Sequence, residues 1–61
     1  MQYLTVQESV RRLRAAGMNA RPQTVRDWIK TQKVRDVLVL GRHSYIYEEE
    51  WEAAIASERA G

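Results

Sequence analysis

Residues 23–30 read QTVRDWIK, and they present two unlike faces when wound at 3.6 residues per turn. An apolar stripe is formed by Val25, Trp28 and Ile29. The opposite side carries the polar and charged side chains Gln23, Arg26, Asp27 and Lys30. The segment therefore predicts a short amphipathic helix that a tryptophan anchors in a small core.

The polar face of this helix matches the groups that base edges offer in a DNA major groove. Arginine and lysine pair with guanine, glutamine pairs with adenine, and aspartate accepts a hydrogen bond from cytosine. A threonine near the helix start suits a phosphate contact, as do the backbone amides there. The candidate major-groove residues are Gln23, Thr24, Arg26, Asp27 and Lys30. An ordinary helix with a solvated polar face has the same pattern, so the rest of the chain must decide.

Another helical pattern lies on the N-terminal side. Thr5 and Glu8 have the spacing of a capping box before an apolar-periodic run. We expect a first helix over residues 6–16, ended by a glycine that tolerates the left-handed conformation. A loop over residues 17–21 follows, and a proline at the start favours a second helix over residues 22–31. Together they predict a helix-turn-helix.

A strand-like pattern follows the second helix. Residues 37–40 and 45–47 are short runs of strand formers, separated by the turn GRHS at residues 41–44. They predict a two-stranded β-hairpin with a basic tip. Because such a hairpin is marginal in water on its own, we expect its leucines to pack into a core with Trp28 and Trp51.

The last segment predicts a third helix. Residues 48–50 are glutamates, which are favoured at a helix N-terminus, and Trp51, Ala54 and Ile55 recur on one face. The order helix, helix, hairpin, helix indicates an α+β fold, a small winged helix-turn-helix with a two-stranded hairpin wing and a C-terminal helix. We expect one domain over residues 1–61.

The net charge of +2 conceals a division along the chain. Residues 1–47 carry nine basic and three acidic side chains, a net charge of +6. Residues 48–61 carry five glutamates and one arginine, a net charge of −4. A basic body favours a polyanionic partner such as nucleic acid. Surface charges in a short protein also segregate without any partner, so the division alone leaves both interpretations open.

The basic hairpin tip is the second candidate DNA contact. An arginine there can enter a minor groove and respond to its width and negative potential. We assign Arg42 and His43 to the minor groove, and Arg21, Lys33 and Ser44 to the DNA backbone. The alternative is that Arg42 only keeps the tip soluble. The arginines of the first helix fit phosphate contacts and plain solvated surface equally well.

Catalysis and cofactor binding have little support in this sequence. The lone histidine, His43, has no cysteine beside it, and the chain contains none. The glutamates at residues 48–52 are more typical of a helix start than of a metal site. No apolar run approaches the ~20 residues that span a bilayer. We expect a cytoplasmic, nucleoid-associated protein that is not an enzyme and binds no cofactor, metal or membrane.

The chain resembles the excisionases, the recombination directionality factors of temperate phages. The likeness is carried by Tyr3-Leu4-Thr5, Gln7-Glu8, Thr24-Val25-Arg26, Trp28, Gly41-Arg42, Tyr45 and Glu49. MerR-type regulators share much of this winged-helix pattern, but they usually have a tighter turn between the first two helices. The longer loop at residues 17–21 is more similar to the excisionase form.

This resemblance implies a mechanism. Excisionases bind short direct repeats beside a phage attachment site, side by side and sometimes head to tail, and they bend the DNA. The bend helps a tyrosine integrase to assemble an excisive complex and disfavours reintegration. The implied partners are double-stranded DNA at attachment-site repeats, a tyrosine integrase and further copies of the chain. Asp27 departs from the pattern, because one member of the family has a basic residue there.

Two other functions remain open at this stage. One is a MerR-like transcriptional regulator that uses the same surfaces at a promoter. The other is a protein-interaction module whose basic face docks an acidic partner. DNA binding makes one structural demand: Arg26 and Arg42 must project from the same side of the scaffold.

Overall fold

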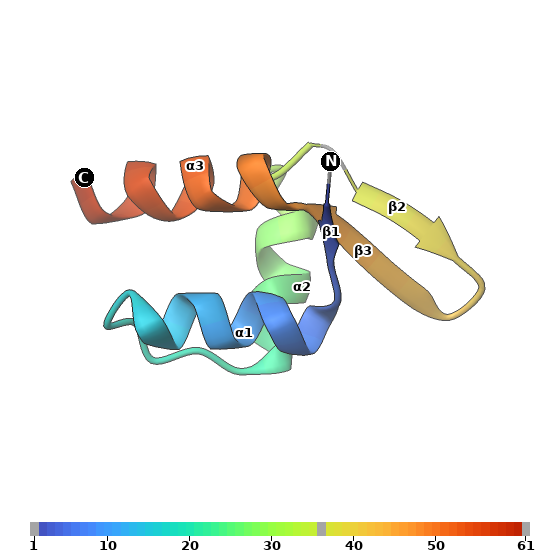
Figure 1. Cartoon of the computed structure of the whole chain (residues 1–61), viewed down its shortest axis with the longest axis horizontal. Helices are drawn as coiled ribbons and strands as arrows, with labels where there is room; N and C mark the ends of the chain where they lie inside the picture. The colour runs from blue at the N-terminus through green and yellow to red at the C-terminus, as the bar shows by residue number, and fades with distance from the viewer. Residues whose placement is uncertain (1, 36, 61) are drawn as a thin grey trace.

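The computed structural model describes residues 2–35 and 37–60, which form an α+β fold of three helices and three antiparallel strands. The elements are β1 (Tyr3–Leu4), α1 (Val6–Ala15), α2 (Pro22–Lys30), β2 (Val37–Leu40), β3 (His43–Tyr47) and α3 (Glu48–Ala60) (Figure 1). The three expected helices are confirmed, and the first two end within one residue of the expected positions. None of the helices in the described ranges has the length and apolar character that crossing a membrane requires.

Local chemistry explains where the first two helices begin and end. The Oγ1 atom of Thr5 accepts a hydrogen bond from the Glu8 N–H at 3.1 Å, which caps α1. Gly17 follows α1 with a φ of +86°, the left-handed conformation that commonly terminates helices. At the start of α2, the Arg21 N–H donates to the Oγ1 atom of Thr24 at 3.2 Å. The threonine cap and the glycine stop of α1 therefore act as expected, and Pro22 begins α2 as expected.

The sheet has three strands instead of the expected two, in the order β1-β3-β2. The additional strand β1 pairs Tyr3 with Tyr47 and Leu4 with Ile46. A strand of two residues has no alternation that a sequence pattern can reveal, so it was not predicted. Its pairing fastens the start of the chain to the end of the hairpin.

The hairpin turn is shorter than expected. Leu40 pairs with His43, so the turn consists of Gly41 and Arg42 alone, while His43 and Ser44 belong to β3. Gly41 has a φ of +62° at the first of the two central positions, where a type II′ turn requires a positive φ. The tight turn places Arg42 at the very tip of the hairpin.

One hydrophobic core joins the helices to one face of the sheet. The rings of Trp28 in α2 and Trp51 in α3 are in contact, with 5.0 Å between their centroids. The buried apolar residues are Leu4, Val10, Leu13, Ala20, Val25, Trp28, Val34, Ile46, Trp51, Ala54 and Ile55. The apolar stripes that helical spacing indicated in the sequence therefore supply most of the core.

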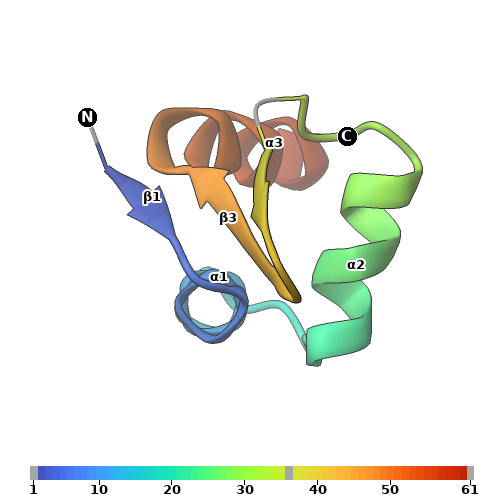
Figure 2. The same ribbon diagram turned by 90° about the vertical axis from the view of Figure 1, so that its right-hand side faces the viewer.

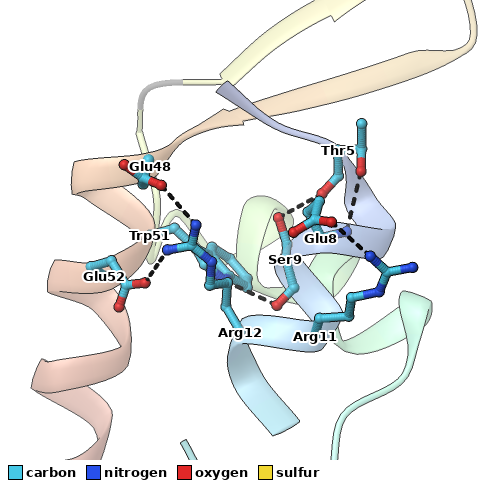
Figure 3. A network of polar contacts seen from close by, with 8 residues as sticks. All are labelled: Thr5, Glu8, Ser9, Arg11, Arg12, Glu48, Trp51 and Glu52. Atoms are coloured by element: carbon cyan, nitrogen blue, oxygen red, sulfur yellow. Dashed lines mark hydrogen bonds and ion pairs between the residues drawn. The ribbon is translucent and has the colours of Figure 1, made fainter. Parts of the chain in front are cut away.

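A buried polar contact links the first and last helices. Ser9 is fully buried in α1, and its Oγ donates to the Thr5 carbonyl oxygen at 2.9 Å. The Ser9 carbonyl oxygen accepts a hydrogen bond from Nε1 of Trp51 at 3.1 Å (Figure 3). Because buried polar groups are costly unless paired, the bond from Trp51 to Ser9 favours one alignment of α1 and α3.

Ion pairs reinforce the same contact at the surface. Nη2 of Arg12 lies 2.7 Å from Oε2 of Glu48, and Nη1 lies 2.7 Å from Oε1 of Glu52 (Figure 3). The hydrogen bonds to Glu52 and then to Glu48 raise the pKa of Arg12 above its ordinary value. Arg12 is therefore a charged link between α1 and α3.

The expectation that the hairpin leucines enter the core is wrong. Leu38 and Leu40 are 42% and 57% exposed, and the fully buried residue of the hairpin is Ile46. Leu38 pairs with Tyr45 and Leu40 with His43, so these side chains share the sheet face opposite Ile46. The far end of the hairpin also projects beyond the helices (Figure 1).

Identical substitutions at a buried and an exposed leucine test this arrangement. We expect Leu13→Ala, at a fully buried position, to lower the free energy of unfolding by about 2–5 kcal/mol. Leu40→Ala, at a position 57% exposed, should cost less than about 1 kcal/mol. Urea unfolding followed by far-ultraviolet circular dichroism measures both. Similar losses for the two variants would contradict the assigned sheet faces.

Two neighbouring arginines test the link between α1 and α3. Arg12 pairs with two glutamates of α3, whereas Arg11 pairs only with Glu8 within its own helix. We expect Arg12→Gln to lower the melting temperature more than Arg11→Gln does. The difference should shrink between about 0.02 M and about 1 M salt, where the Debye length falls to about 3 Å. Equal melting temperatures at low salt would show that the link does not stabilise the fold.

Candidate nucleic-acid interface

A groove of about 540 Å³ lies between the hairpin and the starts of α1 and α2. Thr5, which caps α1, and residues 6 and 7 of α1 line it on one side. Pro22 and Arg26 line it from α2, and residues 42–45 line it from the hairpin. Figure 2 shows how the hairpin turn reaches down between these two helices. Three segments that are distant in the sequence therefore meet at one concave surface.

Two arginines line this groove from different elements. Arg26 is exposed on α2, although Val25 before it and Trp28 two positions after it are both buried. Arg42 is exposed at the tip of the hairpin. Neither arginine forms an ion pair with any residue in the ranges 2–35 and 37–60. The expectation that Arg26 and Arg42 lie on the same side of the molecule is confirmed, and both guanidinium groups are available to an anion.

Of the ten DNA contacts expected from the sequence, four line the groove: Arg26, Arg42, His43 and Ser44. Ser44 is half-buried there, and the other three are exposed. The remaining residues of the set on α2, Gln23, Thr24, Asp27 and Lys30, lie on the same helix as Arg26 but outside the groove lining. They extend the polar surface along α2.

Two of these α2 side chains are coupled to each other. Nε2 of Gln23 donates a hydrogen bond to Oδ1 of Asp27 at 3.0 Å. One amide proton of Gln23 is thus engaged, while its second proton and its carbonyl oxygen remain for an adenine edge. Asp27 orients the glutamine and makes no ion pair with Arg26.

The expected backbone contacts have different surroundings. Lys33 is engaged within the fold, because its Nζ pairs with Oε1 of Glu58 and lies 5.2 Å from the centroid of the Trp28 ring. A phosphate must therefore compete with Glu58 for this ammonium group. Arg21 is exposed at the start of α2. The hydroxyl of Thr24 accepts from the Arg21 amide, and its own proton remains available to a phosphate.

The acidic segment at the end of the chain is folded against the basic body. Glu48 and Glu52 pair with Arg12, and Glu58 pairs with Lys33. Three of the five glutamates beyond residue 47 are thus used within one chain. The acidic segment is thus largely compensated within the chain, whereas Arg26 and Arg42 of the groove have no ion-pair partner among residues 2–35 and 37–60.

Three polar residues of the groove were not assigned from the sequence: Thr5, Gln7 and Tyr45. Their signal was present in the resemblance to excisionases, which includes all three positions. Thr5 and Gln7 lie at the start of α1, and helix starts favour anions. The groove therefore gathers more polar groups than the charge pattern alone indicated.

No protein-family model, curated protein or solved structure matches this chain. Among residues 2–35 and 37–60, no group of three or more histidine, cysteine, aspartate or glutamate side chains is placed to hold a metal ion. The function of the groove must accordingly be inferred from its own geometry and chemistry.

Proposed function

We propose that this chain is a sequence-specific DNA-binding protein with a small winged-helix architecture. In this proposal α2 is the recognition helix in the major groove, and the β2–β3 hairpin is a wing in the adjacent minor groove. One observation carries it: Arg26 and Arg42 line the same groove, from the helix and from the hairpin tip. The proposal also treats the protein as a binding protein without catalytic residues.

The geometry of duplex DNA explains why the groove itself matters. A sugar-phosphate strand separates each major groove from the neighbouring minor groove. A protein that inserts a helix in one and a hairpin in the other must therefore seat that strand between them. The concave surface between α2 and the hairpin is the place for it, with Arg26 and Arg42 on its two sides. Gln7 and Ser44 also line it and offer hydrogen bonds to phosphate.

The outer face of α2 supports base recognition. Arg26 and Lys30 are exposed and suited to guanine, and Gln23 retains the groups that adenine requires. Val25 and Trp28 are buried on the other side of the helix, so the base-reading face is held on a rigid support. The major groove of B-DNA, about 12 Å wide, admits an α-helix.

We further propose that the DNA-binding activity serves as an excisionase. Bound at attachment-site repeats, several copies bend the DNA, and the bend directs a tyrosine integrase toward prophage excision and away from integration. Support comes from the resemblance in sequence and from the connection between α1 and α2. This connection spans residues 16–21, the longer form that favours an excisionase over a MerR-like regulator.

Three arginine variants test DNA binding. We expect Arg26→Ala to weaken binding to a duplex selected from a randomised library by about 1–3 kcal/mol and to relax the preference at one base pair. Arg42→Ala should weaken binding most at sites with a narrow, A·T-rich minor groove. Arg59→Ala is the matched control, because Arg59 is exposed on the last turn of α3, far from the hairpin tip (Figure 1). Fluorescence anisotropy with labelled duplexes measures all three.

The salt dependence of the wild-type protein gives a second readout. The logarithm of the binding constant should fall linearly with the logarithm of salt concentration, with a slope near −0.9 per phosphate neutralised. A flat response would count against DNA as the partner and would favour the protein-interaction module. Equal affinities for the wild type, Arg26→Ala and Arg42→Ala would refute the assigned surface.

An excision assay tests the finer proposal. A plasmid carrying prophage attachment sites is incubated with the tyrosine integrase encoded nearest to this chain, with and without the protein. We expect excision to depend on the wild-type protein, to be lost with Arg26→Ala and Arg42→Ala, and to persist with Arg59→Ala. DNA binding without any effect on excision would reject the excisionase, and a change in promoter output instead would identify a transcriptional regulator.

A further inference from the structure

The hairpin that carries Arg42 also carries exposed apolar side chains at the same end. Val39 is 63% exposed and Leu40 is 57% exposed, the two highest values among the exposed large hydrophobic residues of the described ranges. Leu40 belongs to the last pair before the two-residue turn, opposite His43. The tip therefore combines a cation with aliphatic surface that the core does not use.

We propose that Leu40 is a wedge that enters the DNA minor groove beside Arg42 and kinks the duplex. The inference rests on the proposed DNA-binding function and deepens it, because it assigns the bend to one side chain. Proteins that bend DNA from the minor groove often insert leucine, isoleucine, methionine, phenylalanine or proline between base steps. Leu40 has this chemistry and is the residue immediately before the turn.

Charge and position indicate DNA as the occupant of this apolar tip. Arg42 adjoins Leu40 across Gly41 and has no ion-pair partner in the described ranges. The tip is continuous with the groove that Arg26 lines, so a strand seated there brings its minor groove to the hairpin. A minor groove offers negative potential for the arginine and stacked bases for the leucine.

A wedge also accounts for how so small a domain bends DNA. Smooth bending distributes strain over many stiff base steps, whereas a wedge concentrates it at one step. Pyrimidine–purine steps such as TA and CA unstack most easily. The preferred binding site should accordingly hold such a step beneath the hairpin, a preference that needs no hydrogen bond to the bases.

Three leucine variants test the wedge on a duplex selected by the wild-type protein from a randomised library. The bend is measured by energy transfer between dyes at the duplex ends. Leu40→Ala should reduce the bend by about 20° or more, the smallest kink that such wedges produce. Leu38→Ala is the matched control, since Leu38 is exposed on the same strand and face but two pairs farther from the turn. Leu40→Met retains a wedge-forming side chain and should restore the wild-type bend.

A base analogue reports the local event directly. With 2-aminopurine placed at the step beneath the hairpin, wild-type protein should increase its fluorescence by unstacking it, and Leu40→Ala should abolish the increase. An unchanged bend and unchanged fluorescence with Leu40→Ala would overturn the wedge while leaving DNA binding intact. A shift in the sedimentation of the free protein caused by Leu40→Ala would instead identify a contact between copies, which also overturns it. Absence of any binding by the wild type would reject both this inference and the proposed function.

Discussion

The contact between Trp28 and Trp51 is the interaction on which the rest of this structure depends. It joins α2 to α3 with 5.0 Å between ring centroids, and Nε1 of Trp51 reaches across to Ser9 in α1. Two tryptophans thereby connect all three helices. In a chain of 61 residues, which buries only about 60% of the surface that its unfolded form exposes, few other side chains are large enough for this role. Together with the packing of α2 against α1, that contact positions the exposed groups on α2.

The helices could be predicted because their signals are local. Apolar residues at i, i+3 and i+4, a threonine cap and a glycine stop act within one or two turns, and the structure agrees with them. Which alternate side chains of β2 face the core could not be predicted in this way. Residues 37–40 read VLVL, so either alternate pair suits a core, and only the pairing of Val37 with Ile46 selects the valine side. Strand β1 could not be predicted for a related reason, because two residues are too few to show an alternation of apolar and polar side chains.

The same difference between local signals and contacts of distant residues applies to the candidate site. Its two arginines were recognisable from residue type and from their places on a helix and at a turn. Their common groove agrees with that expectation. The ion pairs that Arg12 and Lys33 form within the chain could not be recognised in the sequence, because their glutamate partners lie 25 to 40 positions away. Composition counts charges, whereas only the folded chain separates cations that hold helices together from cations that remain open to a ligand.

The two-residue strand β1 also has a consequence for how the chain reaches its native state. Leu4 can pair with Ile46 only after residue 46 has been synthesised, and the Ser9 carbonyl oxygen can accept its hydrogen bond only after Trp51 has been synthesised. α1 and α2 are stabilised by local contacts and can form early. The contacts of the sheet and those between α1 and α3 form only when β3 and α3 are present. The core of these residues is therefore completed only once α3 has been synthesised, because Trp51 of that helix is the partner of both Trp28 and Ser9.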